Sequence, residues 1–410
     1  MFYIYEFIFL IFIIFSPIIF LVRIISGKED PKRFLEKFCF YKNIQNTKKT
    51  IWFHGASIGE IKSIIPIIIS LEKNKNIKKI LLTSSTISSA SVIKNHKFKK
   101  TTHVFFPIDT NYLTIKFIRY WKPQIALFID SEIWPNMFKN LNKNKIPIIL
   151  LNARITKKSF DRWRKFPNFS KNIFSKISLA MPQNTETIKY LKTLGVKKIK
   201  IAGNLKYFGH SEKILDKNTK KKFKNRLIFC AASTHHDEEL FIGKMHKELK
   251  LKYNNLLTIL IPRHTNRSNI IIDELKNIEL NTVTRSSSKK IVKDTDIYLV
   301  DTYGEASMFY ELSNITFVGG SIINHGGQNP LEPARLGNYI MHGPNIQNFK
   351  EVYKLLKKLN VSTEVNNISK MQKIIIKKIG YKQSRVLNQK LFSIGKKIIK
   401  KNIFEINKFI

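Results

Sequence analysis

Two glutamates in the first half of the sequence have the chemistry of groups that accept protons or stabilise charge. Glu60 ends the segment His54-Gly-Ala-Ser-Ile-Gly-Glu60, which follows an apolar run, and its carboxylate could accept a proton from an attacking hydroxyl. Ser57 and Glu60 also have the spacing of a capping box, so a structural helix start is an equally good interpretation. Glu132 lies in Asp130-Ser-Glu132-Ile-Trp134-Pro135-Asn136, where two carboxylates stand beside an aromatic ring. The alternative for Glu132 is a role in holding the loop backbone.

Three basic side chains also follow apolar runs and could hold an anion. They lie in Asn152-Ala-Arg154, Gly203-Asn-Leu-Lys206 and Pro262-Arg263-His264. An arginine binds a phosphate through two parallel hydrogen bonds, so Arg263 is a candidate phosphate ligand. Simpler alternatives exist: a surface salt bridge for Arg154, a solvated side chain for Lys206, and a structural role for His264.

Residues 317–333 combine a predicted strand end, a glycine-rich loop and a predicted helix start. The segment Phe317-Val-Gly-Gly-Ser-Ile-Ile-Asn-His-Gly-Gly-Gln-Asn-Pro-Leu-Glu-Pro333 has two glycine pairs, which allow the backbone to approach a ligand closely. Asn329 can cap the helix, Pro330 suits its first position, and Glu332 follows three residues after the cap. The free N–H groups of such a helix start favour a phosphate or a sugar hydroxyl. An ordinary, well-capped turn is the alternative.

Two further segments follow predicted strands in the second half. Asp301-Thr-Tyr303-Gly304-Glu305 comes directly after one of them, so it is expected to face the same ligand. His235 and His236 follow another, but two adjacent histidines are poorly spaced for a shared metal ion on a helix. We therefore predict no metal site.

Short apolar runs alternate with longer amphipathic segments, such as 61–72 and 187–194, which is the pattern of strand–helix–strand units. The predicted strands are Ile51–Phe53, Ile80–Thr83, Val104–Phe106, Ile125–Ile129, Ile146–Leu151, Leu179–Met181, Leu227–Cys230, Leu256–Ile261, Ile297–Val300, Ile315–Val318 and Tyr339–Met341. We predict an α/β protein with two doubly wound, Rossmann-like domains facing a cleft, where ligands bind at the carboxyl ends of the strands. Because each candidate motif directly follows a predicted strand, the motifs are expected to share that cleft.

Residues 1–22 are almost wholly apolar, with Glu6 the only charge before Arg23. A helix of this length measures about 33 Å, which matches the core of a bilayer. A cleaved signal peptide is less favoured, because the start is not basic and no small-residue cleavage site follows. We predict a single-pass membrane anchor over residues 1–22, with the basic residues after it placing the body of the chain in the cytoplasm. The remaining domains are predicted as residues 23–210 and 211–410.

The net charge is +43, from 72 basic and 29 acidic residues. Such a surface attracts anions: nucleic acid, acidic lipid or a phosphorylated substrate. Lys, Ile and Asn are enriched throughout the chain, and a genome rich in A and T produces this without any partner. The basic residues are dispersed and no nucleic-acid-binding motif with interleaved aromatics is recognisable in the sequence, which argues against a nucleic-acid partner.

Seven motifs, in this order, resemble those of the Kdo transferase family, the 3-deoxy-D-manno-octulosonic acid transferases of lipopolysaccharide synthesis. They are Gly55-Ala-Ser-Ile-Gly-Glu60, Glu132-Ile-Trp-Pro-Asn136, Asn152-Ala-Arg154, Gly203-Asn-Leu-Lys206, Pro262-Arg-His264, Asp301-Thr-Tyr-Gly-Glu305 and Gly326-Gly-Gln-Asn-Pro-Leu-Glu332. The resemblance covers nearly the whole chain, including the N-terminal apolar segment. It implies a two-domain glycosyltransferase of the GT-B type that moves Kdo from CMP-Kdo to a lipid A precursor, lipid IVA, with inversion at the anomeric carbon.

The resemblance also implies roles for single residues. Glu60 matches the family's general base, and Glu132 and Lys206 match positions that stabilise the transition state. The family's CMP-binding segments match Pro262, Arg263, Tyr303, Gly304, Glu305, Asn329, Pro330, Leu331 and Glu332. Residues 23–210 would bind the acceptor and residues 211–410 the CMP-sugar, with no cofactor and no metal in the active site. Many members have Met where this chain has Tyr303, which could alter packing on the nucleotide.

The implied partners are CMP-Kdo, the lipid A precursor and the inner membrane, with the catalytic domains on the cytoplasmic side. The runner-up function is a GT-B transferase that uses a UDP-sugar, because the fold would be the same. An alternative from a different class is a membrane-tethered nucleic-acid-binding protein.

Overall fold

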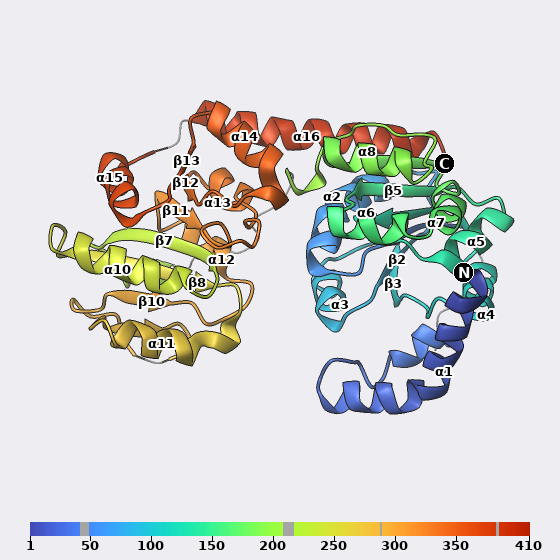
Figure 1. The fold of residues 1–410 in the computed structure, drawn as a ribbon, viewed down its shortest axis with the longest axis horizontal. Helices are drawn as coiled ribbons and strands as arrows, with labels where there is room; N and C mark the ends of the chain where they lie inside the picture. The colour runs from blue at the N-terminus through green and yellow to red at the C-terminus, as the bar shows by residue number, and fades with distance from the viewer. Residues whose placement is uncertain (42–48, 208–216, 288, 383–384) are drawn as a thin grey trace. The chain divides into compact units, whose positions relative to one another are not determined.

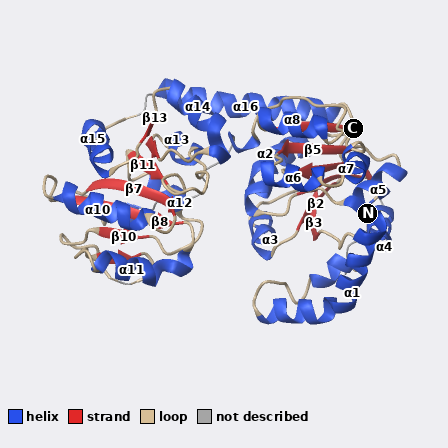
Figure 2. Ribbon diagram, in the orientation of Figure 1, coloured by secondary structure: helices blue, strands red, loops and turns tan. Residues whose placement is uncertain are grey.

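The computed structural model describes residues 1–41, 49–207, 217–287, 289–382 and 385–410. Contacts divide the chain into two compact units, residues 1–208 with 394–410 and residues 209–393. Each unit is built on one parallel sheet with helices around it (Figures 1 and 2). This confirms the predicted fold class of two doubly wound α/β domains. The predicted boundary between residues 210 and 211 lies outside the described residues.

The first unit has six parallel strands in the order β3-β2-β1-β4-β5-β6. They are β1 (Thr50–His54), β2 (Ile80–Ser84), β3 (Thr101–Phe105), β4 (Pro123–Ile129), β5 (Ile148–Ala153) and β6 (Leu179–Pro182). Side chains of β1 alternate between two hydrophobic clusters, with Trp52 in one and Phe53 in the other. Both faces of this sheet are therefore buried, which explains why its strands read as nearly continuous apolar runs.

Helices cover the two faces of the first sheet in separate groups. One cluster takes residues from α4 (Asn111–Trp121), α5 (Pro135–Lys143), α6 (Lys157–Arg164), α7 (Pro167–Phe174) and α8 (Thr185–Thr193). The other takes residues from α2 (Ile58–Glu72), α3 (Ile87–Lys94) and the end of α16 (Arg385–Asn407). In α16, Ile399 and Ile406 are buried in the first unit. The second unit consequently ends at Ser393, whereas the sequence predicts a second domain that runs to residue 410.

The second unit has seven parallel strands in the order β13-β12-β11-β7-β8-β10-β9. They are β7 (Leu227–Thr234), β8 (Leu256–Pro262), β9 (Thr282–Thr284), β10 (Ile297–Leu299), β11 (Ile315–Val318), β12 (Tyr339–His342) and β13 (Ser362–Glu364). Its helices are α9 (Lys217–Lys221), α10 (Glu238–Lys250), α11 (Ser268–Lys276), α12 (Ala306–Tyr310), α13 (Leu331–Arg335), α14 (Lys350–Lys358) and α15 (Ile368–Lys378). Every predicted strand is present, but β9 and β13 were not predicted, because each is short and carries polar residues.

The strand order gives each sheet one switch point, the position where ligands commonly bind in doubly wound sheets. In the first unit the order reverses between β1 and β4, and in the second between β7 and β11. Loops that leave the carboxyl ends of two such strands run to opposite faces of the sheet, so a crevice opens between them. His54 and Ile129 end the first pair of strands, and Thr234 and Val318 end the second. Glu60, Glu132 and the glycine loop all follow these ends.

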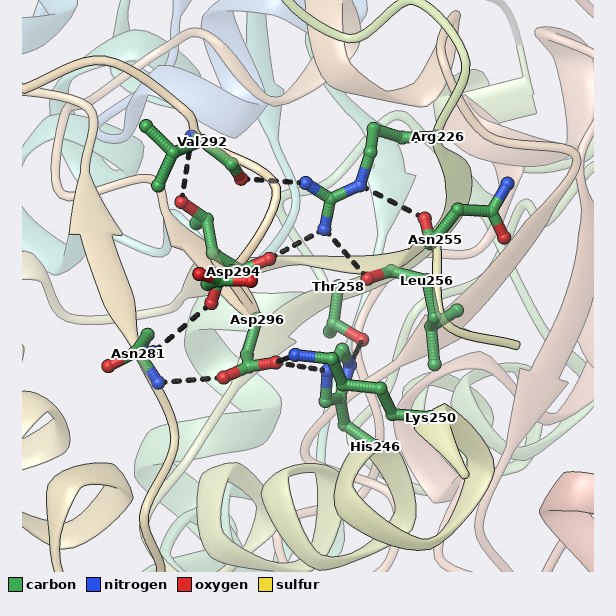
Figure 3. A network of polar contacts seen from close by, with 11 residues as sticks. Arg226, His246, Lys250, Asn255, Leu256, Thr258, Asn281, Val292, Asp294 and Asp296 are labelled. Atoms are coloured by element: carbon green, nitrogen blue, oxygen red, sulfur yellow. Dashed lines mark hydrogen bonds and ion pairs between the residues drawn. The ribbon is translucent and has the colours of Figure 1, made fainter. Parts of the chain in front are cut away.

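A partly buried polar network holds the other end of the second sheet (Figure 3). The guanidinium of Arg226 donates to the carbonyl oxygens of Asn255 at 3.0 Å, Val292 at 2.9 Å and Leu256 at 2.9 Å. Asp296 accepts from Lys250 and, at 2.8 Å, from the backbone of Asn281. Because Arg226 and Asp296 immediately precede β7 and β10, the network joins strands at their amino ends. The network therefore stabilises the sheet and lies at the opposite ends of the strands from the candidate motifs.

The helix α1 (Phe2–Ile25) is the one helix in the described residues that is long and apolar enough to cross a membrane. Pro17 lies inside it and cannot donate to the carbonyl of Ile13. The hydroxyl of Ser16 donates to that carbonyl at 2.7 Å and replaces the missing hydrogen bond. This local substitution lets an apolar helix continue through a proline.

Candidate active site

Glu60 lies at the start of α2, directly after β1, as the sequence predicts. Ser57 is the N-cap, and its hydroxyl accepts from the Glu60 amide at 3.3 Å and donates to the carboxylate at 2.7 Å. The other carboxylate oxygen accepts from the Ala56 amide at 2.7 Å. Burial raises the pKa of Glu60, the hydrogen bond from Ser57 opposes this, and the negative charges of Glu132 and Asp130 raise it further. The capping interpretation is correct, and the raised pKa makes the same carboxylate a better proton acceptor than an exposed glutamate.

Glu132 pairs with a histidine that sequence reasoning did not select. Its carboxylate accepts from Nε2 of His54 at 3.2 Å and from Nε1 of Trp134 at 2.9 Å. The ring of His54 is fully buried, stacks on Phe106 with 3.9 Å between ring centroids, and bonds Thr83 through Nδ1. Burial raises the pKa of Glu132, but the hydrogen bonds and charge of its partners outweigh burial, so the pKa is lowered.

Lys206 is placed beside Asp130 by a short chain of contacts. Nζ of Lys206 lies 3.6 Å from Oδ2 of Asp130, and burial raises the pKa of Asp130 while the charge of Lys206 opposes that shift. The segment that carries Lys206 is fixed because Oδ1 of Asn152 accepts from the Leu205 amide at 2.9 Å. Gly203 has φ +88°, and a Cβ at this position would come within 2.8 Å of Ile398. Only glycine fits this turn without displacing α16.

These residues form one cluster at the switch point of the first sheet. The environments of Glu60 and Glu132 push their pKa values in opposite directions. Two carboxylates separated in this way have different uses: one accepts a proton, and the other stays ionised as a fixed charge. The ammonium of Lys206 adds a cation to the same strand edge. The cluster can therefore take a proton from a hydroxyl and stabilise charge that develops beside it.

In the second unit, cations and histidines gather at the ends of β7, β8 and β11. The ring of His235 lies 4.1 Å from that of His325 and 5.8 Å from that of His264, measured between centroids. Burial lowers the pKa of His235 to about 4, assisted by His325, His264 and the positive charge of Arg263. The Arg263 side chain is exposed, and its amide donates to Thr234 at 2.9 Å. The exposed guanidinium of Arg263 suits an anion such as a phosphate.

The other predicted nucleotide-binding residues are in more varied surroundings. Tyr303 is 73% exposed, and Gly304 has φ +78°. Glu305 forms an ion pair with Arg285 at 3.2 Å, so its carboxylate already has a cationic partner. Leu331 and Pro330 are buried, so each offers a ligand its backbone at most.

The helix start near Asn329 differs from its prediction by one residue. α13 begins at Leu331, with Pro330 as its N-cap in place of Asn329. The reason is local, because Oδ1 of Asn329 accepts from the Leu331 amide at 3.1 Å and closes a turn before the helix begins. Glu332 is therefore the second residue of a five-residue helix.

Glu238 is a further residue that sequence reasoning did not select. Its side chain is fully buried and accepts four backbone hydrogen bonds, from His235 at 3.1 Å, Gly320 at 2.6 Å, Ser321 at 2.9 Å and Ile322 at 2.9 Å. Gly319 approaches so closely that a Cβ would come within 2.5 Å of the Ser233 carbonyl. Glu238 thereby fixes the first half of the glycine loop against the end of β7. The signal in the sequence was an acidic residue shortly after a predicted strand. The sequence did not indicate that the glycine loop would be its partner.

Glu238→Gln is expected to disorder the glycine loop and weaken nucleotide binding. A glutamine offers one acceptor oxygen, and its NH₂ group faces backbone donors, so about two amides lose their partners at about 1–3 kcal/mol each. We expect a clear fall in both melting temperature and CMP affinity, measured by calorimetry. Glu248→Gln is the matched control, since Glu248 is an exposed glutamate of the same helix. Wild-type CMP affinity in the folded Glu238→Gln protein would remove Glu238 from the support of this loop.

Comparison with known proteins identifies the family. A family model described as 3-deoxy-D-manno-octulosonic-acid transferase (kdotransferase) matches residues 32–208. The 3-deoxy-D-manno-octulosonic acid transferase of Haemophilus influenzae is 31% identical over 379 residues, which cover 90% of this chain and 88% of the relative. The chain belongs to the 3-deoxy-D-manno-octulosonic acid (Kdo) transferase family. The enzyme of the same name from Rickettsia bellii is 33% identical over 349 residues, which cover 84% of this chain and 83% of that relative.

Solved structures extend the comparison to the fold. The UDP-GlcNAc 2-epimerase of Neisseria meningitidis bound to UDP-GlcNAc has a TM-score of 0.58 and covers 87% of this chain and 99% of its own. At 13% identity this likeness shows the fold alone. Family membership makes this Kdo transferase a glycosyltransferase, as the seven motifs indicate.

Proposed function

We propose that this Kdo transferase moves Kdo from CMP-Kdo to a hydroxyl of a lipid A precursor, lipid IVA, with inversion. The observation that carries the proposal is the cluster at the switch point of the first sheet, where Glu60 has a raised pKa beside the ionised Glu132. Family membership supplies the sugar, because the relatives' names identify them as transferases of 3-deoxy-D-manno-octulosonic acid.

In the proposed reaction, Glu60 takes the proton of the acceptor hydroxyl as the oxygen bonds to the anomeric carbon. The bond from that carbon to the phosphate of CMP breaks in the same displacement, and the electron pair leaves with CMP. A single displacement inverts the anomeric centre. CMP is a good leaving group, so a base on the acceptor contributes more than an acid on the phosphate. Lys206 and Glu132 are proposed to stabilise charge in the transition state.

The second unit is proposed to bind the CMP part of the donor. Arg263 offers positive charge to its phosphate, and the rings of His235, His264 and His325 offer hydrogen-bond donors. The backbone of residues 303–305 and 329–332 is proposed to contact the nucleotide and sugar. With these groups at the phosphate, the proposed mechanism uses no metal ion and no cofactor. Among the described residues, no group of three or more His, Cys, Asp or Glu side chains is placed to hold a metal ion.

The donor choice separates this proposal from a GT-B transferase that uses a UDP-sugar. Calorimetry with CMP and UMP measures it directly, since neither carries the transferred sugar and the two nucleotides differ only in the base. The proposal expects CMP to bind more tightly than UMP. Proton NMR of the transferred sugar then reports the anomeric configuration. Preference for UMP would favour the runner-up function, and retention of configuration would exclude the single displacement.

Arg263→Ala is expected to weaken CMP binding by about 1.5–3 kcal/mol, the range for hydrogen bonds to a charged group. Arg263→Lys should restore the charge and only part of the affinity, because the planar fork of the guanidinium is lost. Lys276→Ala is the matched control, an exposed cation of the same unit. Unchanged CMP affinity in calorimetry of Arg263→Ala would remove this residue from the site.

The proposed location is the cytoplasmic face of the inner membrane, where a lipid acceptor is accessible. The apolar helix α1 supports membrane attachment, and the basic residues that follow it support the cytoplasmic side. The excess positive charge also suits a bisphosphorylated lipid. Cell fractionation tests this location. We expect the enzyme to be recovered with the membrane fraction.

A further inference from the structure

The first half of α1 is packed on the first unit rather than separate from it. The rings of Phe2 and Phe169 meet edge to face, with 5.2 Å between centroids. The hydroxyl of Tyr5 donates to Oδ2 of Asp109 at 2.8 Å. Asp109 has no exposed surface and also accepts from the backbone of residues 136 and 137, at the start of α5. Release of this end of α1 would remove a partner from a buried carboxylate, which is unfavourable.

The second half of α1 is tied to the same unit through the short helix that follows it. Phe20 is 5% exposed and packs against Phe34 and Phe38, with centroids 5.7 and 5.5 Å away. Both rings belong to the 3₁₀ helix η1 (Phe34–Phe38), which contacts β3. The Phe105 amide donates to the carboxylate of Glu36 at 2.9 Å. Both halves of α1 therefore contact one folded unit.

These two attachments are difficult to reconcile with a helix that crosses a bilayer. Tyr5 and Phe20 are fifteen residues apart, or about 22 Å along a straight helix. In a spanning helix most of that length lies in a hydrocarbon core about 30 Å thick, and its two ends face opposite compartments. The partners Asp109 and Phe34 belong to one unit, which cannot lie on both sides.

The side of α1 that faces away from the unit is nevertheless apolar. Its outer face includes Phe7, Ile11, Ile14, Phe15, Ile18 and Leu21, which are 40–65% exposed. Exposed lysines at positions 28 and 32 follow the helix. An apolar face bordered by cations is typical of a helix that lies in a membrane interface, with its apolar side among acyl chains and its cations near acidic headgroups.

We infer that α1 binds the bilayer from one side, with its outer face in the acyl region and both of its ends on the side of the first unit. The inference rests on the proposed membrane location and replaces the predicted single-pass topology with attachment to one leaflet. We choose the bilayer as the partner of this face because exposed cations follow the helix at one end and the helix has the composition of a membrane segment.

A protease-sensitive tag placed before Met1 of the full chain tests the topology in a Gram-negative host. Attachment from one side predicts that the tag survives protease added to spheroplasts and is cleaved only after lysis. A periplasmic and a cytoplasmic protein in the same cells serve as controls for protease access. Cleavage of the tag in intact spheroplasts would overturn the inference while leaving the membrane location intact. Recovery of the enzyme in the soluble fraction would instead contradict the location on which the inference rests.

Binding of purified protein to vesicles that contain acidic phospholipid tests the outer face itself. We expect the double variant Ile14→Asp, Ile18→Asp to lose at least tenfold in vesicle binding while keeping its melting temperature. Leu251→Asp is the control, because Leu251 is 85% exposed in the second unit. Unchanged vesicle binding by the double variant would overturn the inference, as would a stable dimer of wild-type protein that the same two changes dissociate.

Discussion

Glu60→Gln is expected to lower turnover by about 10²–10⁴-fold, the usual contribution of a positioned proton acceptor. The amide cannot take the proton of the acceptor hydroxyl, yet it keeps the shape of the side chain at the start of α2. CMP binding should change little, because the nucleotide motifs belong to the second unit. Steady-state kinetics with CMP-Kdo and the lipid acceptor measure the effect, with CMP affinity measured in parallel.

Stability distinguishes this role from a purely structural one. The raised pKa of Glu60 means that the folded protein favours the protonated carboxyl, so its contribution to stability is present at low pH and is lost as pH rises through that pKa. The amide mimics the protonated form, and the melting temperature at neutral pH should therefore be kept or slightly raised. A structural Glu60 predicts lower stability with turnover preserved in the folded fraction. Glu186→Gln, at an exposed first-turn glutamate of α8, is the matched control.

The pH dependence of the wild-type rate follows from the same pKa. Only the ionised carboxylate of Glu60 accepts a proton, so kcat/KM should fall as pH drops through its pKa. Burial is the largest cause of the raised pKa, so this fall in kcat/KM (the acid limb of the pH profile) should occur at a higher pH than an exposed glutamate would give. The pH profile of the residual Glu60→Gln activity should lack this acid limb. An unchanged limb in the variant would assign it to another group.

Lys206→Met is expected to lower turnover by about 10²–10³-fold, the usual effect of removing one preorganised charge or donor from a transition state. The methionine keeps much of the length and removes the ammonium that lies 3.6 Å from Asp130. CMP affinity should remain near wild type, because Lys206 belongs to the first unit. Lys197→Met is the matched control, an exposed lysine of that unit. A turnover within a few-fold of wild type would leave Lys206 with a structural role only.

The sequence predicted those features that depend on residues close together in the chain. The apolar runs identify the strands because both faces of each sheet are buried, and the capping box at Ser57 and Glu60 lies within four residues. The strands β9 and β13 were missed because each has three residues, two of them with hydroxyl side chains, and so shows no clear apolar period. The start of α13 was placed one residue early because a side-chain turn at Asn329 competes with the helix cap.

The partners inside the site depend on the order of the strands, which local patterns do not encode. His54 meets Glu132 because β1 lies beside β4 in the sheet. Glu238 holds the glycine loop because β7 lies beside β11, although the loop follows more than eighty residues later. The attachment of α1 is a third case, since an apolar helix of its length has the same composition whether it spans a bilayer or lies along a folded unit.

The central claim is that this Kdo transferase joins Kdo from CMP-Kdo to a lipid A precursor with Glu60 as the base. Incubation of the purified enzyme with CMP-Kdo and lipid IVA, followed by mass spectrometry of the lipid, tests it most directly. The account predicts a lipid that gains the mass of Kdo in step with the release of CMP, and a product formed far more slowly by Glu60→Gln. An unmodified lipid with the wild-type enzyme, or a near-wild-type rate with Glu60→Gln, would contradict it.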